Sequence, residues 1–156
     1  MSLFKKIDQI LAGFGNMKAM QRTHVDTYTE NLIENISGEK IAESPYGQLF
    51  IEFQELNGYH FMNTHVLSGT NIKTFTGGKL IFSNDTETFI LSSDTQEIES
   101  DFSNVSNRYM TFVSYIVEPS EIKKIRSRTF DQITFQYKKK KEIPFQVIKN
   151  ETQNSQ

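Results

Sequence analysis

The chain has 156 residues, of which 37% are hydrophobic and 23% are charged, and its formal net charge at pH 7 is −2. This length suits one domain with a single core, and the absence of cysteine excludes disulfide bonds, thiolate catalysis and cysteine-ligated zinc. The sequence contains no run of about 18 apolar residues, so it predicts no membrane-spanning helix.

The first segment of the chain has the pattern of an amphipathic helix over residues 3–14. Its apolar residues recur at intervals of three and four and form one stripe: Leu3, Phe4, Ile7, Ile10, Leu11 and Phe14. Ser2 is a suitable N-cap, and Gly13 or Gly15 can end the helix. Such a stripe suits packing against a sheet or an interfacial position on a membrane, and the low net charge of the segment favours packing.

Residues 24–36 form the next candidate element. Thr23 and Asp26 resemble a capping box and Gly38 follows the segment, which favours a helix. A threonine-rich start favours a strand instead, and three apolar residues also fit alternation: Tyr28, Leu32 and Ile36. The sequence leaves helix and strand open here.

From Gln48 onward the apolar period changes to two, which is typical of strands. The segments that follow this period cover residues 48–56, 59–67, 71–76, 79–83, 87–92, 96–102 and 108–117. Gly77-Gly78 predicts a hairpin turn, and Asn84-Asp85 predicts a second one. Residues 108–117 are apolar on both faces, so we expect this strand to lie centrally with both faces covered.

A short helix is expected at about residues 119–128, between late strands. Pro119 suits the first turn, and Glu121 favours the positive end of the helix dipole. Two strands follow, each with alternating apolar side chains: Ile133, Phe135 and Tyr137, then Ile143, Phe145 and Val147. Pro144 cannot donate to a ladder, so it places the last strand at or near a sheet edge.

These elements predict one globular α+β domain over residues 1–149. Its architecture is an antiparallel β-meander sheet of seven to nine strands, covered by the N-terminal helical segment. Residues 150–156 have nothing to bury and are expected to form a disordered polar tail.

Charge is segregated along the chain. Residues 23–103 carry 3 basic and 13 acidic groups, whereas residues 104–156 carry 10 basic and 5 acidic groups. The candidate interaction surface consists of basic side chains in this last third: Lys123, Lys124, Arg126, Arg128, Lys138, Lys139, Lys140 and Lys141. The chain must turn within the four consecutive lysines, which favours a solvated hairpin tip over contact with an acidic partner. No helix-turn-helix, zinc finger or RNA-binding aromatic motif accompanies the charges, so nucleic acid is not favoured as a partner.

No catalytic, metal-binding or cofactor-binding constellation emerges from the sequence. His60 and His65 are five residues apart, which on a strand directs the two rings to opposite faces. Glu97, Glu99 and Asp101 alternate and would line one face of a strand, where a solvated face paired with lysines is favoured over a cation site. We therefore predict no catalytic residue, no metal and no cofactor, and the sequence favours a non-catalytic protein over an enzyme.

Three functions remain open. The leading hypothesis is a non-catalytic binding or assembly module that contacts a protein partner, or a second copy of itself, through the basic C-terminal third. The alternative is a carrier of a small apolar ligand, with a cavity between the curved sheet and the N-terminal helix. A hydrolase or transferase is the third, because active sites built from distant residues leave no local pattern. Asp8 and Gln9 interrupt the apolar region that a signal peptide requires, so we expect a cytoplasmic protein.

Overall fold

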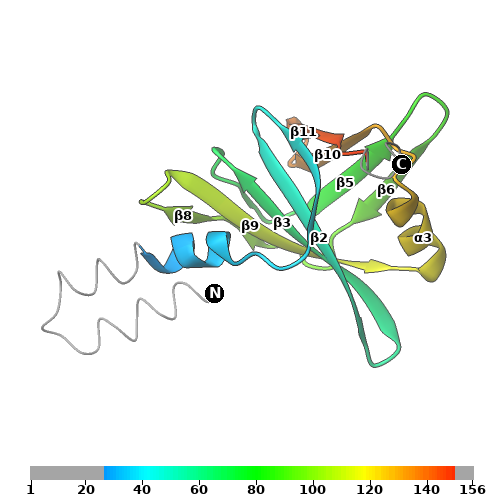
Figure 1. Ribbon diagram of the computed structural model, residues 1–156, viewed down its shortest axis with the longest axis horizontal. Helices are drawn as coiled ribbons and strands as arrows, with labels where there is room; N and C mark the ends of the chain where they lie inside the picture. The colour runs from blue at the N-terminus through cyan, green and yellow to red at the C-terminus, as the bar shows by residue number, and fades with distance from the viewer. Residues whose placement is uncertain (1–26, 150–156) are drawn as a thin grey trace, which may run out of the picture.

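The computed structural model describes residues 27–149, which form a helical segment over residues 27–34, one later helix and eleven strands (Figure 1). The bounds of the named elements are β1 (Glu39–Ser44), β2 (Gly47–Leu56), β3 (Tyr59–Ser68), β4 (Lys73–Thr74), β5 (Gly78–Ser83), β6 (Thr88–Ser92), β7 (Ile98–Glu99), β8 (Asp101–Ser103), β9 (Arg108–Val117), α3 (Pro119–Ser127), β10 (Gln132–Tyr137) and β11 (Lys141–Val147). The helix expected over residues 3–14 and the tail expected over residues 150–156 lie outside the described residues.

Nine strands form one antiparallel sheet in the order β6-β5-β10-β11-β1-β2-β3-β9-β8, and β4 pairs with β7 in a small second sheet. This confirms a predominantly antiparallel α+β fold. The order is not the expected simple meander, because β9 pairs with β3 and the β10–β11 hairpin lies between β5 and β1. The sheet is strongly curved (Figure 1), and just after β6 the Asp94 N–H donates a 3.1 Å hydrogen bond to the Ser114 carbonyl of β9. The inner face of the sheet therefore surrounds a core.

The inner face is filled by side chains of the protein itself. In β10, alternate side chains are buried, as the sequence predicted: Ile133, Phe135 and Tyr137. The register places Phe135 opposite Leu80 of β5 and Ile143 of β11. The largest fully buried side chains are Tyr115, Phe82, Phe130, Phe135 and Phe145. The abundant phenylalanine thus contributes to a solid core.

The helical segment at 27–34 lies on the outer face of the sheet. Ile33 packs against Leu67 of β3 and Met110 of β9 in a second, smaller cluster. The sequence left helix and strand open at residues 24–36. The structure forms a helix over residues 27–34.

Several local predictions were correct, and others need correction. The Asn84 side chain accepts hydrogen bonds of 2.9 Å from the N–H groups of Thr86 and Glu87, which confirms a turn between β5 and β6. The hairpin expected at Gly77-Gly78 is wrong, because β4 pairs with β7 and not with β5. The expectation that residues 108–117 lie centrally with both faces covered is also wrong. Strand β9 has only the short strand β8 beyond it in the sheet, and Phe112 on its outer face is 52% exposed.

Helix α3 occurs where the sequence predicted it and ends at a defined point. Glu118 and Glu121 form a reciprocal capping box, with the Glu118 N–H donating a 2.7 Å hydrogen bond to the Glu121 carboxylate. Pro119 occupies the first turn. At the other end Arg128 adopts the left-handed conformation, with φ of 54°, so the chain leaves the helix there and turns toward β10.

Candidate functional site

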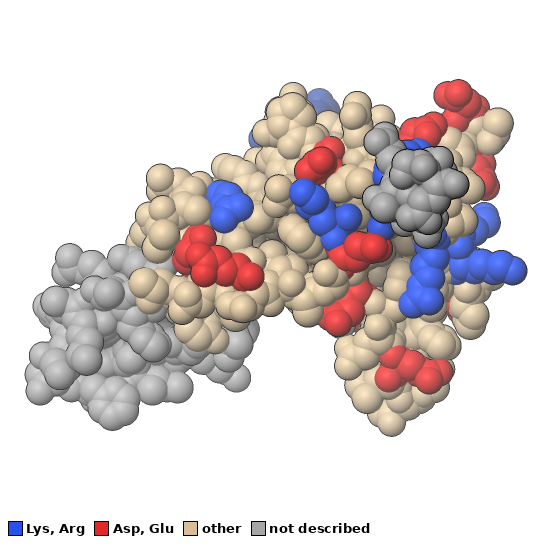
Figure 2. Space-filling model, in the orientation of Figure 1, with Lys and Arg blue, Asp and Glu red and all other residues tan. Residues whose placement is uncertain are grey.

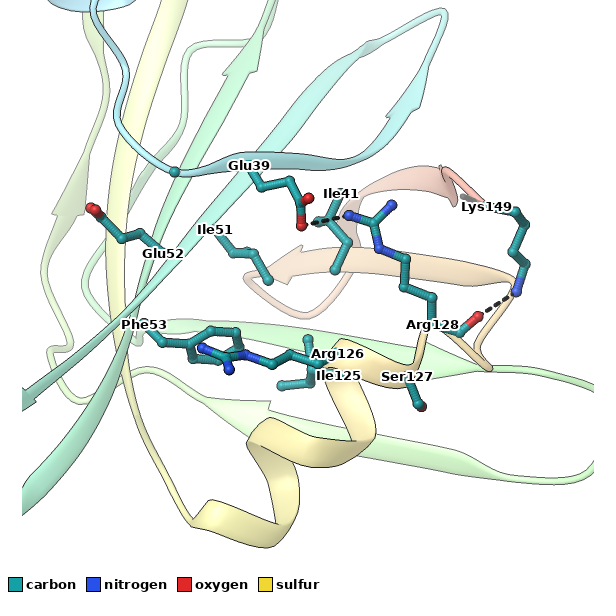
Figure 3. A pocket seen from close by; sticks show the side chains of 11 residues that line it. Glu39, Ile41, Ile51, Glu52, Phe53, Ile125, Arg126, Ser127, Arg128 and Lys149 are labelled. Carbon is teal, nitrogen blue, oxygen red and sulfur yellow. Dashed lines mark hydrogen bonds and ion pairs between the residues drawn. The ribbon is translucent and has the colours of Figure 1, made fainter. Parts of the chain in front are cut away.

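A hollow of about 700 Å³ lies between the start of β1, the middle of β2 and the last turn of α3 (Figure 3). Its lining residues are Gly38, Glu39, Ile41, Ile51, Glu52, Phe53, Ile125, Arg126, Ser127, Arg128 and Lys149. These residues come from four separate stretches of sequence. The site is therefore a product of the tertiary fold.

The hollow is open because β1 is shorter than β2. The two strands pair from Ser44 opposite Gly47 to Glu39 opposite Ile51, and β2 then continues to Leu56 without β1 beside it. Gly38 makes the approach to β1 possible: its φ is +95°, and an added Cβ would lie 2.5 Å from the Ile51 carbonyl oxygen. The chain can therefore close onto β2 here only with glycine.

The floor of the hollow is apolar. Ile41, Ile51 and Ile125 are buried members of the main core, and Phe53 packs against the same core while remaining partly accessible. Alternation in β2 directs Ile51 and Phe53 inward, whereas Glu52 belongs to the opposite face. The hollow thus exposes one accessible edge of a core that is otherwise closed.

Two of the basic residues in the lining are engaged within the protein. Arg128 forms an ion pair with Glu39 and also donates a 2.6 Å hydrogen bond to the Ile148 carbonyl oxygen. Lys149 donates to the carbonyl oxygens of Arg128 and Phe130, at 2.7 and 2.8 Å, and so satisfies groups just beyond the end of α3. These contacts attach α3 to β1 and to the chain after β11.

Arg126 differs from these two basic residues. Its guanidinium lies 5.0 Å from the centroid of the Phe53 ring, and within residues 27–149 no carboxylate lies within ion-pair distance of it. Glu52 accepts a 2.8 Å hydrogen bond from the Ser37 hydroxyl, and its carboxylate points away from Arg126 in Figure 3. Arg126 is therefore a cation held beside an apolar floor with hydrogen-bond donors still available.

The structure divides the basic residues predicted from sequence into two groups. Arg126 and Arg128 meet at the hollow, and Lys124 lies near them, 3.6 Å from the Glu87 carboxylate and over the Phe89 ring. Lys123 is exposed on the same helix. Lys138–Lys140 form the turn between β10 and β11, and Lys141 begins β11 opposite Tyr137. This tip lies at the other end of β10, a strand about 17 Å long. On the face drawn in Figure 2, basic side chains gather over α3, and acidic side chains lie around them.

The histidine pair and the acidic ladder considered from the sequence do not form a site in the described part of the chain. His60 and His65 both lie on β3, so their rings point to opposite faces, as predicted. The ladder of Glu97, Glu99 and Asp101 is interrupted, because Glu99 ends β7 and Asp101 begins β8 in a different sheet. Across residues 27–149, no three histidine, aspartate or glutamate side chains are grouped to hold a metal ion. In the same part of the chain, no helix has the length and apolar character needed to cross a membrane.

Sequence reasoning missed most of the hollow. Phe53 was part of an expected strand, but nothing local distinguishes it from other inward phenylalanines, and Glu39 and Lys149 lie outside any expected motif.

Comparison of the chain with protein-family models, with curated proteins and with solved structures finds no match. The geometry of the hollow is therefore the basis for a functional conclusion.

Proposed function

We propose that the protein binds a small organic anion with an apolar body, and that it does so without catalysing a reaction. The observation that carries this proposal is the position of Arg126. Its guanidinium has no carboxylate partner in the described part of the chain, and it lies over Phe53 at the border of an apolar floor.

The hollow offers separate contacts for the two parts of such a ligand. Its volume of about 700 Å³ is in the range of sites for small molecules, about 300–1,000 Å³. The partly accessible Phe53 ring supplies an apolar surface for the body of the ligand, whereas the three isoleucines of the lining, Ile41, Ile51 and Ile125, are almost completely buried. A guanidinium presents several N–H donors in one plane, which suits a carboxylate, sulfonate or phosphate head group.

The charges of the lining favour an anion over a cation. Arg128 is paired with Glu39, and Lys149 is paired with Asp131. Arg126 therefore remains as a cation of the lining without a carboxylate partner in the described part of the chain, and the Glu52 carboxylate points away from it. A carrier of a small ligand was the alternative expected from the sequence, with a cavity between the sheet and the N-terminal helix. The binding site proposed here is instead the hollow beside α3. The inner face of the sheet is occupied by buried aromatic side chains, whereas the hollow beside α3 is accessible.

Isothermal titration calorimetry with 1-anilinonaphthalene-8-sulfonate, an aromatic sulfonate, tests the proposal. We expect Arg126→Gln to weaken binding about tenfold, which corresponds to about 1.4 kcal/mol and is typical of one charge-assisted contact. The matched control is Lys123→Gln, an exposed residue on the same helix that does not line the hollow. Absence of binding to the unmodified protein, or equal weakening by both substitutions, would contradict the proposal.

A second candidate function is contact with an acidic protein through the hairpin tip. Lys138–Lys141 are all exposed, and no ion pair to a carboxylate engages them within residues 27–149. Four adjacent cations attract an acidic surface strongly at low ionic strength and weakly above it, because salt screens exposed charges. Affinity capture at low salt tests whether an acidic protein binds. Light scattering at low and physiological salt, with and without the captured protein, then measures whether a complex forms. A protein that stays monomeric and captures nothing at low salt would argue against it.

A further inference from the structure

The edge of β2 beside the hollow is only partly paired. Strand β1 lies along β2 as far as Glu39 opposite Ile51, and β2 continues to Leu56 in a hairpin with β3 that protrudes from the sheet (Figure 1). Within residues 27–149, no strand lies on this side of β2 beyond Ile51. Residues 53–56 therefore form a free strand edge about 13 Å long, which we call the β2 edge.

The turn between β2 and β3 sets the hydrogen-bonding direction of this edge. Asn57 and Gly58 have positive φ angles, of 54° and 83°, and they connect Leu56 to Tyr59 as a two-residue turn. In such a turn the two flanking residues exchange hydrogen bonds with each other. Leu56 therefore directs its N–H and C=O groups toward β3.

The direction alternates along an antiparallel strand, which assigns the remaining backbone groups. Gln54 directs its N–H and C=O groups toward β3, whereas Phe53 and Glu55 direct theirs away from β3. Ile51 follows the same alternation, because its carbonyl oxygen lies 2.5 Å from the place of a Cβ added to Gly38 on the β1 side. The β2 edge thus presents the backbone donors and acceptors of Phe53 and Glu55 to an added strand.

We propose that an extended peptide with a free C-terminal carboxylate pairs with the β2 edge as an added strand, and that its carboxylate contacts Arg126. This inference rests on the proposed function, because it identifies the organic anion of the hollow as a peptide terminus. An added strand gains affinity from main-chain hydrogen bonds and specificity from its alternating side chains. The β2 edge offers the hydrogen bonds, and Arg126 beside Phe53 offers the specific contact.

The direction of the peptide follows from the position of Arg126. Strand β2 runs from the hollow toward the turn, and Phe53 is the residue of the β2 edge that lines the hollow. An antiparallel peptide runs the opposite way and ends opposite Phe53, whereas a parallel peptide brings its amino end there. Strand β1 occupies the place opposite Ile51, so the peptide has to stop at this point. A terminal carboxylate is therefore the group that arrives near Arg126.

The side chains of the β2 edge indicate which peptide fits. Phe53 and Glu55 lie on the same face of β2, and directly opposite side chains of an antiparallel pair contact each other. The last residue of the peptide lies opposite Phe53, so an apolar side chain suits it. The third-last residue lies opposite Glu55, whose side chain is 64% exposed and 3.5 Å from His60. A basic side chain suits that position.

A second copy of the chain is the competing occupant, through antiparallel pairing of two β2 edges. Pairing of Phe53 with Glu55 of the copy carries the copy's Asn57 to a position opposite Ile51, which Glu39 already occupies. A shift of two residues removes this overlap but places Glu55 directly opposite Glu55 of the copy. Like charges in this position are destabilising. The β2 edge therefore favours a chain that ends opposite Phe53.

Calorimetric titration of the full chain with synthetic peptides tests this proposal. The probe is acetyl-Ala-Lys-Thr-Phe with a free C-terminal carboxylate, and the matched control has the same sequence with a C-terminal amide. We expect the amide to bind about tenfold more weakly, because it lacks the charge that Arg126 recognises. Arg126→Gln should weaken binding of the carboxylate peptide by about the same factor, and Lys123→Gln should leave it unchanged.

Methyl groups on the peptide nitrogens test strand pairing without any change to the protein. In the proposed register the N–H groups of the last and third-last residues donate to the carbonyl oxygens of Phe53 and Glu55, whereas the N–H of the second-last residue points away from β2. We expect N-methylation of the third-last residue to weaken binding about tenfold. N-methylation of the second-last residue is the matched control and should change binding little.

Amide hydrogen exchange of the isotope-labelled protein reports the same alternation from the other side. We expect the peptide to slow exchange at the N–H groups of Phe53 and Glu55, which face the β2 edge. The N–H groups of Gln54 and Leu56 face β3, so their exchange should change little.

Each outcome decides the proposal. Alternating effects of N-methylation, together with weaker binding of the amide, support it. If the protein binds the aromatic sulfonate through Arg126 but does not bind the peptide, or binds both methylated peptides equally, the proposed function stands and the added strand is overturned. Slow exchange at Phe53 and Glu55 that appears without peptide as the protein concentration rises assigns the β2 edge to a second copy, and this also overturns the proposal. Absence of binding by sulfonate and peptide alike contradicts both the proposed function and the added strand.

Discussion

The Glu30 carboxylate accepts a 2.6 Å hydrogen bond from the Ser106 hydroxyl, and this bond links the helical segment at 27–34 to the loop between β8 and β9. The Ser103 hydroxyl donates a second bond of 2.7 Å, and Arg108 lies 3.5 Å from the same carboxylate. The bonds from Ser106 and Ser103 stabilise the charged form and, with the charge of Arg108, hold the pKa of Glu30 below its ordinary value. The helical segment is therefore attached to the sheet by polar contacts as well as by Ile33.

Acidification should weaken this attachment. Because the pKa of Glu30 is lower in the folded protein than in the unfolded chain, its contribution to stability is complete above the ordinary value of 4.5 and is lost as the pH falls below it. We expect Glu30→Gln to lower the melting temperature near neutral pH and to flatten its decline between about pH 5 and 3. Thermal unfolding followed by circular dichroism measures both effects.

Glu34→Gln is the matched control for this prediction, because Glu34 is exposed on the same helical segment. Its melting temperature should follow that of the unmodified protein at each pH. Parallel profiles for all three proteins would show that Glu30 does not contribute to the acid sensitivity.

Gly78 lies against the most buried part of the core. An added Cβ would lie 2.6 and 2.7 Å from two carbon atoms of the Phe135 ring, which is fully buried. We expect Gly78→Ala to lower the free energy of unfolding by about 1–3 kcal/mol, the usual cost of overpacking. Urea denaturation measures the change.

Gly69→Ala provides the comparison, since no heavy atom lies within 4 Å of the added Cβ and the backbone is not in the left-handed region. Its free energy of unfolding should change little or rise by about 0.4–1 kcal/mol, because alanine restricts the unfolded chain. Equal effects of the two substitutions would mean that the contact with Phe135 does not determine the cost.

Most of the strands were predictable because their side chains alternate, and β1 shows where that signal fails. In β1 the adjacent residues Ile41 and Ala42 are both buried, and the register with β2 shifts between Lys40 and Ala42. Such an irregularity breaks the period of two, so the pattern of a strand disappears from the sequence. Strand order was not predictable either, because the pairing of β3 with β9 joins distant segments that carry no mutual signal.

The candidate site was predictable only in part, for a related reason. The sequence identified Arg126 and Arg128 as members of a basic region, and α3 places both at the hollow. It also grouped them with Lys138–Lys141, which β10 carries to the opposite end of the sheet. Charge counted along a chain does not report distance in space. The contact between Arg126 and Phe53 became visible only in three dimensions.

Removing Glu39 should strengthen anion binding. Glu39 is the carboxylate partner of Arg128 within the described part of the chain, while the Ile148 carbonyl holds another N–H group of the same guanidinium. We expect Glu39→Gln to release Arg128 toward the hollow and to tighten binding of the aromatic sulfonate several-fold in the same calorimetric titration. Glu43→Gln is the control, because Glu43 pairs with Lys40 outside the hollow. Unchanged or weaker binding after Glu39→Gln would show that Arg128 does not reach the ligand.

The four lysines at the tip of the β10–β11 hairpin should contribute little to the stability of the fold. Lys138 has a φ of 59°, a conformation that asparagine and glycine adopt more easily than lysine, and all four side chains are exposed. We expect the combined change Lys138→Asn, Lys139→Gly, Lys140→Ser and Lys141→Thr to leave the free energy of unfolding unchanged or to raise it slightly. Exposed substitutions usually change stability by less than about 0.5 kcal/mol each, and the repulsion among four like charges is removed. Urea denaturation at low and high salt measures the effect, since any gain that comes from relieved repulsion should shrink as salt screens the charges. A loss of several kcal/mol would mean that the lysines make stabilising contacts within the fold.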